Sequence, residues 1–82
     1  MVKIHSHAMK RMLERGITEE EIMGTVLDGE SLKAKLGRRA FRRNFVYNDV
    51  WLGKSYTTKQ VEVVAVHEGA DWIVITAIAR YF

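Results

Sequence analysis

Three side chains that can do chemistry together lie four residues apart near the start of the chain: His7, Arg11 and Arg15. Residues with this spacing share one stripe of a helix, one turn apart. An imidazole can donate or accept a proton near neutral pH, and a guanidinium binds a phosphate through two parallel hydrogen bonds. The stripe therefore predicts a phosphate site. The alternative is that His7 caps or packs locally and the two arginines lie on a solvent-exposed face.

When RNA is cleaved without a metal, the ribose 2′-hydroxyl group attacks the neighbouring phosphate. This reaction requires a base for the hydroxyl proton, an acid for the leaving oxygen, and cations for the developing charge. Histidine can supply the first two and arginine the third. Further along the chain, His67 ends a predicted strand and Thr76 interrupts an apolar run. A threonine hydroxyl can bind a phosphate or a 2′-hydroxyl group, although threonine is also simply a good strand residue. The predicted catalytic residues are His7, Arg11, His67 and Thr76.

Two short helices are predicted to position the N-terminal residues. Ser6 can accept a hydrogen bond from a first-turn N–H, and Gly16 can adopt the left-handed conformation that ends a helix. Thr18 and Glu21 form a capping box, which begins the next helix, and Gly29 ends it. The tight corner between the helices predicts a helical hairpin. Its two helices are Ser6 to Gly16 and Thr18 to Asp28, with apolar stripes of Ala8, Met9, Met12 and Leu13 and of Ile22, Met23, Val26 and Leu27.

From Ser31 the hydrophobic period changes from that of a helix to that of a strand. Val2 to Ile4 could add an edge strand or merely lead into the first helix. The run Trp72 to Ala79 is apolar on both faces, which is typical of a central strand covered on both sides. The predicted strands are Leu32 to Leu36, Ala40 to Tyr47, Gln60 to His67 and Trp72 to Ala79. The sequence therefore predicts an α+β fold, with the helical hairpin packed on one face of a three- or four-stranded antiparallel sheet.

Basic residues are concentrated in the middle of the chain. Between Ser31 and Gln60, Asp49 is the single acid, although the whole chain carries a net charge of only +3. The cations of this stretch are Lys33, Lys35, Arg38, Arg39, Arg42, Arg43, Lys54 and Lys59. Such a stretch favours an acidic partner such as nucleic acid, although it can also be a solvated basic strand. The predicted nucleic-acid-binding residues are Arg15, Arg38, Arg42, Arg43 and Arg80, together with Arg39 of the same basic strand. Tyr47, Trp51 and Tyr56 can stack on bases or complete a small core.

Composition excludes several classes of protein and site. With 82 residues the chain is predicted to be one domain, residues 1–82. Cysteine is absent, so disulfides, thiolate nucleophiles and cysteine-based zinc sites are excluded. A metal site of His5, His7 and His67 is weakly indicated, because no carboxylate lies at ligand spacing, and we predict neither metal nor cofactor. No segment approaches the apolar length of a membrane span and no secretory signal is visible, so we expect a cytoplasmic protein.

The segment His7-Ala8-x-x-Arg11-Met12-x-x-Arg15-Gly16-Ile17 resembles the signature of a family of small bacterial and archaeal proteins classed as a domain of unknown function. That family is itself similar to the RelE and BrnT group of ribonuclease toxins. The resemblance implies a RelE-like fold and a metal-independent endoribonuclease of the toxin-antitoxin type, or an RNA-binding protein derived from one. RNA and an antitoxin protein would be its partners, with a homodimer as a further expectation. The alternative is a non-catalytic basic module that binds nucleic acid or protein, or that self-associates.

Overall fold

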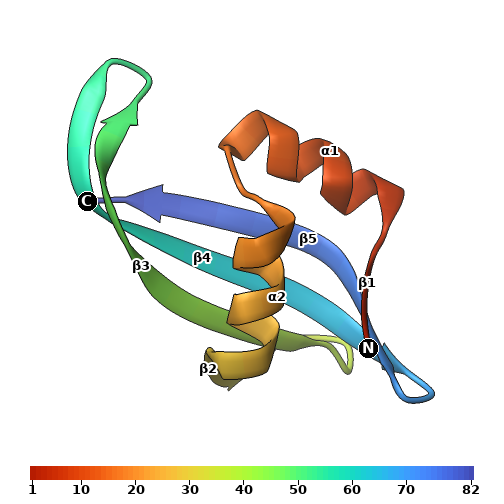
Figure 1. Ribbon diagram of the computed structural model, residues 1–82. Coiled ribbons are helices and arrows are strands. Elements are labelled where there is room, and N and C mark those ends of the chain that lie inside the picture. The colour runs from red at the N-terminus through yellow and green to blue at the C-terminus, as the bar shows by residue number, and fades with distance from the viewer.

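Two helices lie on the same side of a five-stranded sheet in the computed structural model, which describes residues 1–82 (Figure 1). The strands lie side by side in the order β1-β5-β4-β3-β2. In chain order the elements are β1 (Val2–Ile4), α1 (Ser6–Arg15), α2 (Glu19–Asp28), β2 (Glu30–Lys33), β3 (Arg39–Trp51), β4 (Lys54–Glu68) and β5 (Asp71–Tyr81). The predicted combination of two N-terminal helices with a sheet is therefore confirmed.

The sheet is mixed, so the prediction of a three- or four-stranded antiparallel sheet is wrong. Strands β2 to β5 pair antiparallel, but β1 runs parallel to β5, with Val2 opposite Trp72 and Ile4 opposite Val74. The N–H of His5 extends this pairing by donating to the carbonyl of Val74 over 2.9 Å. The sequence could not reveal this pairing, because a three-residue strand is too short to show its partner or direction.

Strand β4, rather than β5, is the centre of the sheet. It pairs with β3 on one side and with β5 on the other, whereas β5 has only the short β1 as its second neighbour. The expectation that Trp72 to Ala79 is a central strand covered on both faces is therefore wrong. Both helices cover one face of the sheet, and no element of the chain covers the other (Figure 1).

The helices pack on different strands instead of on each other, so the predicted helical hairpin is also wrong. Helix α1 lies over β5, and α2 lies over β3 and β4 (Figure 1). The core lies between this helix layer and the sheet, with Val61 and Val63 of β4 fully buried at its centre. Its remaining members are Ala8, Met12, Ile17, Ile22, Val26, Phe41, Ala65, Val74 and Ala77.

Local signals at the helix ends are mostly confirmed. The cap of α1 is the Nδ1 atom of His5, which accepts the N–H of His7 over 3.2 Å, so the predicted cap Ser6 is instead the first helical residue. At the other end Gly16 has a φ of 68°, and the N–H of Ile17 donates to the carbonyl of Met12. The capping box of Thr18 and Glu21 is present in full, with bonds of 2.9 and 3.1 Å.

Half of the predicted apolar stripe of α1 is exposed. Ala8 and Met12 are buried against the sheet, whereas Met9 and Leu13 are 44% and 84% exposed. Because successive residues turn by about 100° around a helix, Met9 and Leu13 lie to one side of the buried row. They line an open groove of about 310 Å³ that reaches Thr18 and Glu19 at the start of α2.

We expect Gly16→Ala to destabilise the protein more than Gly53→Ala. Both glycines have a positive φ, 68° and 82°, which costs another residue about 1 to 2 kcal/mol. A Cβ atom at residue 16 would also lie 2.5 Å from the ring of Trp51, whereas nothing lies within 4 Å of one at residue 53. Urea unfolding of the two variants measures the difference, and equal losses would contradict a packing role for Gly16.

Candidate nucleic-acid interface

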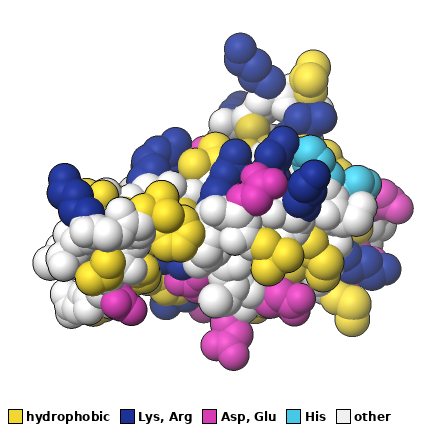
Figure 2. All heavy atoms as spheres, turned by 90° about the horizontal axis from the view of Figure 1, so that it is seen from above, with side chains coloured by type: hydrophobic (Ala, Val, Ile, Leu, Met, Phe, Trp, Pro, Cys, Tyr) yellow, Lys and Arg dark blue, Asp and Glu magenta, His cyan; other side chains and the backbone are white.

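Helix α1 carries the predicted phosphate stripe on the side opposite to its exposed apolar residues. The His7 side chain is exposed, and Arg11 donates to the carboxylate of Glu14 over 3.0 Å. Viewed from above, Lys and Arg side chains surround an acidic one beside the histidines (Figure 2). His7 and Arg11 are therefore accessible to a ligand, although Arg11 would share its charge between that ligand and Glu14.

The third member of the stripe, Arg15, has a structural partner. Its Nη1 atom donates to the carbonyl of Ala77 over 2.5 Å. Beyond Val74, β5 has no neighbouring strand on that side, so this bond satisfies a carbonyl of an otherwise open sheet edge. Arg15 thus attaches the end of α1 to β5 and is less available to a phosphate than Arg11.

The four predicted catalytic residues lie in three separate places. Thr76 is opposite Val64, and both point away from the helices, because the neighbouring Val63 and Ala77 are buried against them. His67 lies near the end of β4, where its ring packs on Trp72 with centroids 4.5 Å apart. Only His7 and Arg11 are neighbours. Their catalytic roles stay a prediction, but the structure does not bring the four together in one cleft.

Three of the predicted nucleic-acid-binding arginines are held by carboxylates. Arg42 pairs with Glu30 over 3.2 Å, and Arg80 pairs with Glu62 over 3.3 Å. Arg43 lies 3.7 Å from Asp28, the last residue of α2, and donates to the carbonyl of Gly24 in the middle of that helix. Adjacent residues of a strand point to opposite faces, so Arg42 and Arg43 cannot form one patch.

Four cations without a carboxylate partner lie in and beside the turn between β2 and β3. Lys33, Lys35, Arg38 and Arg39 are all exposed and take part in none of the ion pairs of the protein. Residues 36 and 37, Leu36 and Gly37, both have a positive φ, which reverses the chain between the two pairs of cations. We call these four cations the basic turn. The sequence prediction missed Lys33 and Lys35, although their position around a Leu-Gly pair was a usable signal.

The basic turn lies at the same end of the sheet as His67. Arg39 pairs with Ala65 of β4, and His67 follows two residues later on the same face. Lys3 of β1 is at this end too, but it is held by Asp71 over 3.1 Å. The hydrogen bond from Lys3 keeps the pKa of the Asp71 carboxyl below its usual range. The free charge at this end therefore comes chiefly from the basic turn.

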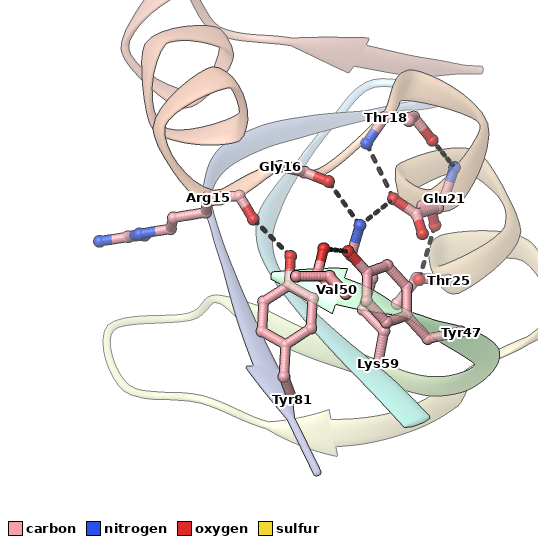
Figure 3. Close-up of polar contacts among 9 residues, drawn as sticks. All are labelled: Arg15, Gly16, Thr18, Glu21, Thr25, Tyr47, Val50, Lys59 and Tyr81. Carbon is pink, nitrogen blue, oxygen red and sulfur yellow. Dashed lines mark hydrogen bonds and ion pairs between the residues drawn. The ribbon is translucent and has the colours of Figure 1, made fainter. Parts of the chain in front are cut away.

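A buried lysine fixes the corner between the two helices. Lys59 of β4 is only 3% exposed, and its ammonium group donates to the carbonyl of Gly16 over 2.5 Å and to the carboxylate of Glu21 over 2.8 Å (Figure 3). The same carboxylate oxygen accepts the N–H of Thr18. One side chain of the sheet thus joins the end of α1 to the start of α2.

Aromatic rings surround this lysine. The Tyr81 hydroxyl donates to the carbonyl of Arg15 over 2.8 Å (Figure 3). The ring of Trp51 stacks on that of Tyr81, with centroids 5.1 Å apart. Burial raises the pKa of Tyr81 to about 12, so this hydroxyl keeps its proton and remains a donor. Tyr47 and Tyr56 also pack against Tyr81. The aromatic residues considered for base stacking therefore contribute to a small core, and the corner positions α1.

Other site types find no support in the geometry. No three His, Asp or Glu side chains lie close enough together to hold a metal ion. Neither helix has the length and apolar character needed to cross a membrane.

A family model described as "Domain of unknown function (DUF4258)" matches residues 4–79. The chain belongs to this family. The matched segment contains the whole helix layer, the Lys59 corner and the basic turn, so the features described above lie within the family domain. No curated protein and no solved structure matches the chain. The resemblance to RelE and BrnT toxins stays a prediction.

Replacing Lys59 by methionine should lower the free energy of unfolding by about 3 kcal/mol, because the Glu21 carboxylate would lose its buried partner. Urea unfolding followed by circular dichroism measures this change. The exposed Lys35, which has no partner, supplies the control: Lys35→Met should change stability by no more than about 0.5 kcal/mol. Equal stability of the two variants would show that the corner does not anchor the helices.

Proposed function

We propose that this protein binds RNA through the basic turn. The observation that carries the proposal is that Lys33, Lys35, Arg38 and Arg39 are exposed and unpaired, whereas Arg42, Arg43 and Arg80 have carboxylate partners. A cation that already has a carboxylate must give it up to bind a phosphate, which offsets much of the gain. A free cation instead releases the counterions of the phosphate and gains affinity from their release.

A pair of rings beside the basic turn supports a single-stranded partner. His67 packs on Trp72, and His67 is exposed two residues beyond Ala65, the partner of Arg39. Trp72 is half-buried against Phe41, so His67 is the exposed ring of the pair. An exposed ring next to cations suits unpaired nucleotides, because a base can stack on the ring while the cations contact the backbone. The predicted similarity of the family to ribonuclease toxins makes RNA the nucleic acid to test first.

We expect the double variant Arg38→Ala, Arg39→Ala to bind a single-stranded RNA oligonucleotide at least about tenfold more weakly at low salt. Each phosphate contact with a single strand adds about 0.7 to the slope of log affinity against log salt concentration. Removing two contacts should therefore make this slope shallower by about 1.4. Fluorescence anisotropy over a salt series measures both quantities.

The matched control is Arg42→Ala, which removes a neighbouring strand arginine that is held by Glu30. Its affinity and salt slope should stay close to those of the unchanged protein. Binding that survives the double variant, or that falls equally in Arg42→Ala, would argue against the basic turn. A salt-independent affinity would argue against phosphate contacts altogether.

A second candidate function is metal-independent RNA cleavage at α1. It is supported by the exposed imidazole of His7, one helical turn from the guanidinium of Arg11. His7 would move the proton of the 2′-hydroxyl group or of the leaving oxygen, and Arg11 would stabilise the charge on the phosphate. Under this candidate the products carry a 2′,3′-cyclic phosphate, and an antitoxin protein is expected to restrain the enzyme.

If this second function is present, His7→Ala should slow RNA cleavage by about 10² to 10⁴ while the protein stays folded. The assay is cleavage of a labelled RNA in the presence of a chelator, with analysis of the product ends. Lys10→Ala, an exposed cation of the same helix, is the control and should cleave normally. Absence of cleavage by the unchanged protein, or full activity of His7→Ala, would leave RNA binding as the only proposed function.

A further inference from the structure

The face of the sheet opposite the helices is apolar at its centre. Val61, Val63 and Ala65 are buried under the helices, so the residues that alternate with them, Val64 and Val66, point to the other face. The register places further apolar residues beside them. We call this group the open-face patch, and its members are Leu32, Ala40, Val64, Val66, Ile73 and Ile78. All are half-buried except Ala40, which is 7% exposed, and the polar Thr76 lies among them opposite Val64.

This patch explains why β5 has the sequence of a strand covered on both faces. One set of its side chains packs under α1, and the other set, which includes Ile73 and Ile78, joins the patch. No element of the chain lies over this second face (Figure 1). An apolar patch that its own chain leaves uncovered often marks an interface.

On the side of the patch away from the basic turn, the bordering charges are neutralised on the same face. Arg42 pairs with Glu30, and Arg80 with Glu62. Between them the amide of Gln60 donates to Asn44 over 3.0 Å. This side of the patch offers no net charge to a phosphate backbone or to a strongly charged protein, so it favours an occupant that is itself apolar and electrically balanced.

We propose that the open-face patch is the interface of a homodimer in which two copies pack sheet against sheet. A second copy supplies the same neutral border and the same apolar centre, and a twofold contact brings the patch onto itself. Two sheets of equal twist pack well face to face, about 10 Å apart, with their side chains interdigitating.

The size of the face fits this occupant. The three long strands β3, β4 and β5 pair over about ten residues each, so the face that they form has a flat area on the order of 500 Å². The short outer strands β1 and β2 bring the area of the face closer to the roughly 800 Å² of surface that each partner buries in a standard interface.

The helix layer is a poorer surface for a second copy. Its exposed Leu13 lies beside a groove whose far side begins with Glu19, followed by Glu20, and neither acid has an ion-pair partner. A twofold contact that brings these acids against their own copies would be opposed by like-charge repulsion. The proposed dimer leaves the helix layer and the basic turn free, and it does not depend on RNA binding.

The test is the molar mass in solution over a range of protein concentrations, measured by sedimentation equilibrium. The unchanged chain should be dimeric at micromolar concentrations. Val64→Lys should weaken the dimer by at least about 100-fold, because each copy would bury an unpaired charge at the contact. The control Leu13→Lys introduces the same charge on the helix layer and should leave the dimer intact.

Circular dichroism shows whether Val64→Lys is folded. If it is not, the double variant Val66→Thr, Ile73→Thr replaces it, since threonine suits a strand and removes apolar surface. This variant should also be more monomeric than the unchanged chain. A monomer at all concentrations, a dimer insensitive to the open-face substitutions, or a dimer dissociated by Leu13→Lys would each overturn the proposal.

Discussion

The burial of one ammonium group sets the arrangement of the helix layer. Lys59 is almost fully removed from solvent in the central part of the fold, and a buried charge is tolerated only with well-placed partners. Those partners, the carbonyl of Gly16 and the carboxylate of Glu21, come from the adjoining ends of the two helices. The corner between α1 and α2 is therefore fixed over β4. With its last turn also held by Tyr81, α1 must run along β5, which leaves His7 and Arg11 facing solvent.

Ion pairs and hydrogen bonds decide which basic residues have a structural role and which remain available to a ligand. Lys59 and Arg15 attach helices to the sheet, and Arg43 binds α2 through the carbonyl of Gly24. Arg42 and Arg80 are neutralised by glutamates on the opposite face. The cations that remain free of carboxylates in the β2–β3 segment are gathered at one turn. A partner attracted by charge would thus meet one end of the sheet, although basic residues occur from Lys3 to Arg80.

The apolar surface of the sheet is likewise divided into a part that the chain covers and a part that it leaves uncovered. An 82-residue chain with two short helices can cover only one face of its sheet, and here that face takes both of them. The other face carries valine and isoleucine from β4 and β5 beside neutralised charges. The backbone groups at the edge of β5 find partners within the chain. The short β1 pairs with it in parallel, and the guanidinium of Arg15 donates to the carbonyl of Ala77. The edge is thus partly satisfied within the chain, whereas the open face has no partner there.

Local signals determined much of this protein from the sequence alone. The Thr18–Glu21 capping box, the helix end at Gly16 and the strand periods depend on neighbouring residues, and each appears in the structure. Tertiary structure alone decided the parallel pairing of β1, the central place of β4, and which arginines are paired, because these follow from contacts between distant residues. For the same reason the spacing of His7 and Arg11 was readable in advance, while the separation of Thr76 and His67 from them was not: strand register and the choice of sheet face set it.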